Sequence, residues 1–320
     1  MKKRMAQIFL LASILTLAVF LNGCSPAVQS DLEAATPSPE IAEPAAEAAQ
    51  LATARVTAEI SEAGRAMVTG HNNTQYIVDA DTESTGLHEI DTLLAAQITC
   101  GVFVAEKAAQ ELDIPLKGVT GTAVFDENTQ QVQVFLDLPG ADGEQILDLA
   151  NNFRQRCPIY TTLSAAKSVE FIPGEQYNSG DDDSAAVTAE LFRFGGANVT
   201  ANGQTFVMDS VPPLDGPNEE LNPLDLMLGG LATCSSFIYE REAPAADVTV
   251  TVEGDFDPTG VRDLEGPNPR IQNIRVSMLV DKFDEAQAKK AEEQIKEECY
   301  LPNILEGTVN FAVSTEQANS

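Results

Sequence analysis

Two stretches of the sequence, each with a cysteine near its carboxyl end, decide the fold. The stretch Asn222–Phe237 reads NPLDLMLGGLATCSSF, and the stretch His88–Phe103 reads HEIDTLLAAQITCGVF. An offset of 134 residues superposes identical residues in the two copies: Asp91 on Asp225, Leu94 on Leu228, Thr99 on Thr233, Cys100 on Cys234, Phe103 on Phe237, and Glu106 on Glu240. This internal repeat indicates that one structural unit occurs twice in the chain.

Each copy has the apolar periodicity of a buried helix. At about 3.6 residues per turn, each cysteine shares one face of such a helix with small or apolar residues. These are Leu93, Ala96, Phe103 and Val104 around Cys100, and Met227, Gly230, Phe237 and Ile238 around Cys234. The pattern predicts two central helices, each with one cysteine on a buried stripe.

The order of elements around the two helices is also the same, which predicts a tandem duplication of one α+β unit. In each copy, strands precede the cysteine helix, and a β-hairpin, a second helix ending at a cysteine and a last strand follow it. The long Gly/Pro-rich loop 255–269 accounts for the wider cysteine spacing in the second copy, 65 residues against 57. The predicted segments are a signal peptide (1–23), a spacer (24–53), module 1 (54–173), a linker (174–186), module 2 (187–315) and a tail (316–320).

The charge of the chain restricts the classes of partner. The 49 acidic and 19 basic residues give a net charge of −30. Nucleic acid and anionic membrane surfaces would repel such a chain, so neither is predicted as a partner. With two histidines and no clustered Cys/His spacing, the sequence predicts no metal site, and no cofactor is implied.

The amino terminus has the pattern of an export signal. A basic run, Lys2-Lys3-Arg4, precedes an apolar run from Ile8 to Leu21. The tetrapeptide Leu21–Cys24 that follows resembles a bacterial lipobox, which implies cleavage before Cys24 and lipidation of its sulfur. The mature protein is therefore expected on the bacterial cell envelope, anchored to a membrane through lipid on Cys24. The following segment, rich in Ala, Pro, Ser and Glu, reads as a solvated spacer.

These features together resemble the OsmC/Ohr family of thiol peroxidases, which act on organic hydroperoxides. Asn222-Pro223 lies twelve and eleven residues before Cys234, as in the family, and Cys157-Pro158 matches the family's second cysteine. Since family members are intertwined homodimers, the resemblance implies a monomeric pseudo-dimer. Each of its two OsmC-like modules is expected to have an antiparallel sheet and a central cysteine-bearing helix. The implied catalytic residues are Cys100 with Cys157 and Cys234 with Cys299.

The sequence departs from the family at the residues that activate the cysteine. The family uses an arginine from a turn after the first strand and a glutamate ten residues before the cysteine. The arginine is retained as Arg65 in module 1, whereas Ala197 stands near the matching place in module 2. The glutamate positions hold Ile90 and Leu224. Asp91 and Asp225, one residue later, are open to two interpretations, a catalytic acid or an N-cap.

The resemblance implies a thiol cycle. A buried thiolate needs a cation, which predicts Arg65 beside Cys100 and makes module 1 the more competent site. The resulting sulfenic acid on Cys100 would condense with Cys157, and an external dithiol, of lipoyl type in the family, would reduce the disulfide. The alternative is a catalytically degenerate lipoprotein that binds a small molecule or protein and whose cysteines form structural disulfides, which an exported protein favours.

Overall fold

The computed structural model describes residues 51–318 except 82–83, 85, 127–128, 130, 167, 178–185 and 306–308. The two cysteine-bearing stretches form its two longest described helices. They are α1 (Glu89–Glu111) and α4 (Pro223–Glu242). The predicted signal peptide, the lipidation site Cys24, most of the spacer and most of the linker lie outside the described residues.

A capping box begins each cysteine helix. The side chain of Asn222 accepts the backbone N–H groups of Leu224 and Asp225, and a carboxylate oxygen of Asp225 accepts the N–H of Asn222. His88 and Asp91 form the same box at the start of α1. The two aspartates therefore lie at the third helical position and not at the N-cap, which was one of their two interpretations, because each helix begins three residues earlier than an N-cap at these positions requires.

The second half of the chain repeats the element order of the first. The first half contains β1 (Ala52–Glu62), β2 (Arg65–Thr69), β3 (Gln75–Asp79), α1, β4 (Thr120–Asp126), β5 (Gln131–Asp137), α2 (Gly143–Arg156), α3 (Pro158–Ala165) and β6 (Val169–Pro173). The second contains β7 (Ala186–Arg193), β8 (Gly196–Ala201), β9 (Gln204–Asp209), α4, β10 (Val248–Phe256), α5 (Pro258–Arg262), β11 (Gln272–Val280), α6 (Glu285–Glu298), α7 (Tyr300–Ile304) and β12 (Phe311–Gln317). The 3₁₀ turns η1 (His71–Asn73) and η2 (Pro212–Leu214) complete the described elements.

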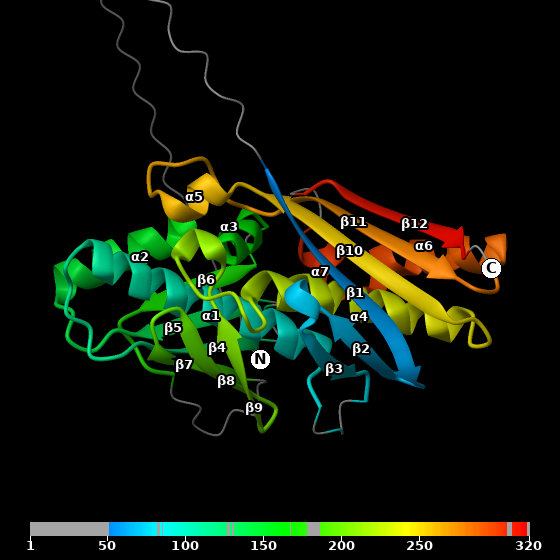
Figure 1. The fold of residues 1–320 in the computed structure, drawn as a ribbon, viewed down its shortest axis with the longest axis horizontal. Helices are drawn as coiled ribbons and strands as arrows, with labels where there is room; N and C mark the ends of the chain where they lie inside the picture. The colour runs from blue at the N-terminus through cyan, green and yellow to red at the C-terminus, as the bar shows by residue number, and fades with distance from the viewer. Residues whose placement is uncertain are drawn as a thin grey trace, which may run out of the picture. The chain divides into compact units, whose positions relative to one another are not determined.

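The strands form two six-stranded sheets, and each sheet takes three strands from each half of the chain. One has the order β12-β11-β10-β1-β2-β3 and the other the order β6-β5-β4-β7-β8-β9. The halves meet where β1 pairs with β10, and where β4 pairs with β7. Figure 1 shows the first of these junctions, with β1 in blue beside β10 in yellow.

This topology corrects the prediction that each module has its own antiparallel sheet. Both sheets are mixed, because β5–β6 and β11–β12 are parallel pairs. In each pair a helix-containing connection returns the chain in the same direction, as parallel pairing requires. The residue boundaries of the two modules are not tested by this topology and stay a prediction.

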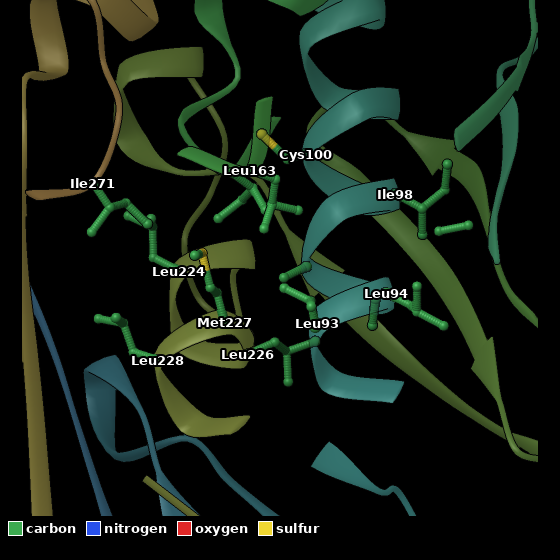
Figure 2. Close-up of a cluster of buried hydrophobic side chains, with 14 of the residues drawn as sticks. Leu93, Leu94, Ile98, Cys100, Leu163, Leu224, Leu226, Met227, Leu228 and Ile271 are labelled. Carbon is green, nitrogen blue, oxygen red and sulfur yellow. The ribbon is translucent and has the colours of Figure 1, made fainter. Parts of the chain in front are cut away.

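The helices α1 and α4 pack against each other in the core, and Figure 2 shows their leucines meeting there. Close approach depends on Gly230, because a Cβ at this position would lie 3.2 Å from the carbonyl oxygen of Glu89 and would collide with the Thr92 hydroxyl. Of the described helices, α1 alone is long and apolar enough to cross a membrane by composition. The window that passes this test is 89% buried, as expected of a core helix.

Candidate functional site

The structure pairs the four cysteines of the two modules as two disulfides. Cys100 of α1 is bonded to Cys157, and Cys234 of α4 is bonded to Cys299, with Cα atoms 5.9 and 6.0 Å apart. Both separations lie in the usual range for disulfides. Each second cysteine ends one helix and precedes another, since Cys157 separates α2 from α3 and Cys299 separates α6 from α7. The pairing expected from the family resemblance is therefore present in the structure.

The Cys100–Cys157 disulfide is closed to solvent. Cys100 is 3% exposed and Cys157 is fully buried. The loop 257–271 of the second half is fastened on both sides of Cys157. On one side the Thr162 hydroxyl accepts the N–H of Ile271 at 2.8 Å, and on the other side Arg156 binds the loop. Figure 2 shows the side chain of Leu163 next to Cys100.

Arg156, 1% exposed, holds this loop in place. Its guanidinium donates to the backbone carbonyls of Val261 and Arg262 at 3.0 and 2.9 Å. It also forms an ion pair with Glu111 of α1 at 2.6 Å. The first half has a short hairpin where the second half has this loop. The loop 257–271 therefore covers the Cys100–Cys157 disulfide, whereas the corresponding hairpin of the first half is too short to cover Cys234–Cys299 in the same way.

The Cys234–Cys299 disulfide is the more accessible one, because Cys234 is only partly buried. It borders a cavity of about 20 Å³, large enough for about one water molecule. The cavity is lined from α1 by Glu89 and Leu93, from α4 by Met227, Gly230, Leu231 and Cys234, and beyond them by Cys299 and Leu301. Burial raises the pKa of the Glu89 carboxyl.

Glu89 is the functional candidate that the sequence did not reveal. It lies eleven residues before Cys100, one residue from the family position, and it borders the cysteine of the other helix. The crossing of α1 and α4 at Gly230 brings the two together. At the 134-residue offset its counterpart is Pro223, so the second half supplies no such carboxyl toward Cys100.

The predicted partnership of Arg65 with Cys100 is not found in the structure. Arg65 forms an ion pair with Asp79 at 2.6 Å, and its hydrogen bond with Asp79 raises the arginine pKa. The hairpin that carries Arg65 packs against α4, where the N–H of Gly64 donates to Glu240 at 3.2 Å. Strand exchange explains the difference, since it places the hairpin of the first half on the cysteine helix of the second.

The second half has an equivalent arginine pair. Arg193 binds Asp209 at 2.9 Å, and Asp209 occupies the same place at the end of β9 that Asp79 occupies at the end of β3. Arg193 precedes its turn whereas Arg65 follows its turn, so matching by position could not relate them. Each arginine is committed to an aspartate instead of a cysteine.

Asp225 has a structural partner of its own. Its carboxylate accepts both the backbone N–H and the ring Nδ1–H of His71, from the turn between β2 and β3. It lies nine residues before Cys234, which is about 13 Å along a helix that rises about 1.5 Å per residue. Asp91 and Asp225 therefore act at the helix starts in this structure, and neither borders a disulfide.

The His71–Asp225 pair makes one stability contribution dependent on pH. The hydrogen bond that the His71 ring donates to Asp225 is the main cause that raises the pKa of His71. Burial opposes this shift, and the charges of Asp225 and Asp209 add to it. Because the pKa of His71 is higher in the folded protein than in the unfolded protein, protonation of His71 stabilises the fold. This stabilisation is fully present below the unfolded pKa of about 6.5 and is lost as the pH rises through the folded pKa.

We expect His71→Asn to lower the free energy of unfolding by roughly 1 kcal/mol more at about pH 5.5 than at about pH 9. Asparagine is the replacement of choice, because the other half of the chain has an asparagine, Asn202, in the equivalent turn between β8 and β9, where its side chain contacts His88. Urea denaturation of both proteins at the two pH values measures the difference. An equal loss at both pH values would show that folding does not raise the pKa of His71.

Comparison with known proteins places the second half of the chain in a family. Residues 216–314 match the model of the OsmC family, described as OsmC-like protein. No curated protein matches the sequence. Two solved structures are similar over their nearly complete length: an OsmC-like protein from Mycoplasma pneumoniae and an organic hydroperoxide resistance protein from Elizabethkingia anophelis.

The two similarities are distant. The first protein is 19% identical, with a TM-score of 0.34 and coverage of 43% of this chain and 99% of its own. The second is 18% identical, with a TM-score of 0.31 and coverage of 41% and 94%. The family match includes α4 with Cys234, and also Cys299. The chain thus carries an OsmC-like domain at residues 216–314.

Proposed function

We propose that the protein is a thiol-dependent peroxidase that reduces organic hydroperoxides at the Cys234–Cys299 pair. One observation carries the proposal. Within the OsmC-like residues, the partly exposed Cys234 is bonded to Cys299 and borders a cavity that is also lined by the half-buried carboxyl of Glu89, from α1. The Cys100–Cys157 disulfide, closed by the loop 257–271, then serves as a structural crosslink.

The proposed reaction begins with the reduced pair. The Cys234 thiolate attacks the distal peroxide oxygen, the O–O bond breaks, and the alkoxide leaves with the electron pair. Glu89, whose pKa burial raises, takes up the proton that the Cys234 thiol loses and donates it to the alkoxide, which becomes an alcohol. Cysteine becomes a sulfenic acid. The sulfur of Cys299 then attacks the sulfenic sulfur of Cys234 and displaces its hydroxyl group. The displaced hydroxide takes up the Cys299 thiol proton and leaves as water, and the disulfide seen in the structure forms.

An external dithiol completes the cycle. It donates two electrons and two protons to the disulfide and becomes a disulfide itself, which restores both thiols. Leu93, Met227 and Leu301 beside Cys234 are apolar, which suits the alkyl or aryl part of an organic hydroperoxide. The cavity has room for about one water molecule in the disulfide form, so the proposal requires that it widens when the disulfide opens.

The test is to reduce the protein, add cumene hydroperoxide and map the disulfides by mass spectrometry. We expect Cys234–Cys299 to form with one equivalent of hydroperoxide, to release cumyl alcohol and to reopen with dihydrolipoamide, while Cys100–Cys157 resists reduction under native conditions. If both disulfides resist dithiols, or the thiols do not react with the hydroperoxide, the cysteines are structural. The protein would then be a binding module. The commitment of Arg65 and Arg193 to aspartates favours this second function.

We further propose that the chain is a covalent pseudo-dimer of two OsmC-like modules. The repeated element order and the exchange of three-stranded hairpin units between the two sheets support this interpretation. Pairs of contacts also repeat across the halves. Gly64 binds Glu240 and Gly195 binds Glu106. The two glutamates correspond at the 134-residue offset, and the two glycines occupy the same place in their hairpins.

We also propose that lipid on Cys24 anchors the mature protein to the bacterial cell envelope. The support is the basic and apolar runs before Leu21–Cys24. Cys24→Ala is expected to move the protein from the membrane fraction to the soluble fraction, measured by immunoblotting after ultracentrifugation. A variant that still sediments with membranes and resists carbonate extraction would place the anchor elsewhere in the chain.

A further inference from the structure

A groove with apolar walls lies at the carboxyl end of α1, away from the cavity at Cys234. Its volume is about 430 Å³, within the range of roughly 300–1,000 Å³ typical of small-molecule sites. One wall is the segment that follows α1, with Ile114, Leu116 and Val119. The facing wall is the end of β7 and its turn, with Phe192 and Phe194.

A single carboxyl, that of Glu106, lines this groove. Its Oε2 accepts the N–H of Gly195 at 2.8 Å, and burial raises its pKa to about 7. Among the described residues, no ion pair to Glu106 is formed. Arg193, also in the lining, is paired with Asp209. The Oε1 atom therefore remains available to a donor that enters the groove.

The aromatic wall belongs to one half of the chain only. The hairpins correspond through the pairs Glu62–Arg65 and Arg193–Gly196 at their ends. This register matches Phe192 with Ser61 and Phe194 with Ala63. Phe192 and Phe194 are 50% and 40% exposed, although neither is needed to cover the core. Arg193 lies over the Phe192 ring, 5.3 Å from its centroid, so this wall already attracts one cation beside the half-buried carboxyl of Glu106.

We propose that this groove binds a small organic ammonium ion with an apolar body. The ammonium group donates to Oε1 of Glu106, and the apolar body lies between the aromatic wall and Ile114, Leu116 and Val119. An ammonium ion supplies the missing counter-charge for the buried carboxylate, and aromatic faces attract cations. The site is independent of both disulfides, so it adds a binding function to the proposed peroxidase.

The chemistry of Glu106 makes the proposal distinguishable from simple apolar binding. The cation binds the ionised carboxylate, so below about pH 7 binding releases one proton from Glu106 to the buffer. Between pH 6 and 8 the ionised fraction of such a group rises about 10-fold, and the affinity rises by the same factor. A neutral ligand of the same shape gains nothing from ionisation of the carboxyl.

The test uses the full-length protein and two probes, phenethylammonium chloride and the neutral 2-phenylethanol, in isothermal titration calorimetry in two buffers at each pH. We expect the ammonium ion to bind about 10-fold more tightly at pH 8 than at pH 6, with proton release at pH 6. The alcohol is expected to bind at least about 10-fold more weakly at pH 8.

Glu106→Gln and the double variant Phe192→Ser, Phe194→Ala are each expected to weaken ammonium binding at least about 10-fold. Glu240→Gln, the same change at the equivalent position of the other half, is the matched control and leaves binding unchanged. Circular dichroism checks folding, and the double variant and the pH dependence still decide if Glu106→Gln does not fold. Equal binding of the two probes, or binding that does not change with pH or with these substitutions, would overturn the proposal.

Discussion

We expect Cys234→Ser to lower the rate of the proposed reduction of organic hydroperoxides by at least about three orders of magnitude. The serine hydroxyl has no accessible anionic form near neutral pH and is a far weaker nucleophile than a thiolate. Cys234 is the first cysteine of the proposed cycle because it is the partly exposed member of its pair, whereas Cys299 is 1% exposed. The measurement is hydroperoxide consumption by the reduced protein, with dihydrolipoamide as the reductant.

The matched control is Cys100→Ser, the same change at the equivalent residue of the other helix. We expect it to keep at least about half of the activity, because Cys100 is 3% exposed and the inserted loop fastens the segment around Cys157. Glu89→Gln tests the proton donor and is expected to lower the rate by about 100-fold without preventing disulfide formation. Activity that survives Cys234→Ser and is lost with Cys100→Ser would assign the reaction to the first pair.

The sequence predicted the helices better than the sheets, for a physical reason. Apolar periodicity reports which face of a segment is buried, so α1 and α4 could be located from the stripe that carries each cysteine. In β1 and β7, the alternation of apolar and polar residues identifies each segment as a strand, but it does not identify the strand that pairs with it. The exchange of hairpins between halves depends on long-range pairing, such as β1 with β10, which leaves no local signal.

The candidate site shows the same limit. The pairing of Cys100 with Cys157 and of Cys234 with Cys299 was expected from the resemblance to the OsmC/Ohr family, and it is present in the structure. Glu89 was missed because its relation to Cys234 crosses between two helices. The expected contact of Arg65 with Cys100 is not formed, because strand exchange places the hairpin of Arg65 on α4 and the arginine pairs with Asp79 there. Contacts between the halves thus determine the site, and they were the least predictable part of the structure.

Arg156→Met lowers the free energy of unfolding by about 3 kcal/mol, since removal of one partner from a buried ionic cluster leaves the others unpaired. Arg156 is 1% exposed, and its loss leaves the carbonyls of Val261 and Arg262 without their donor. Glu111 is partly exposed and regains water, which keeps the loss from being larger. The change in the urea midpoint, with an unchanged slope, measures the effect.

Arg154→Met is the matched control, because it makes the same change on the same helix at an exposed position over the ring of Phe171. Its expected cost is within about 1 kcal/mol. Release of the loop 257–271 also predicts a local effect of Arg156→Met that global destabilisation alone does not give. Under native conditions, dithiothreitol should reduce Cys100–Cys157 at least about 10-fold faster in this variant, with reduction of Cys234–Cys299 unchanged. Equal acceleration at both disulfides would mean that global unfolding, and not the loop, controls access to the first pair.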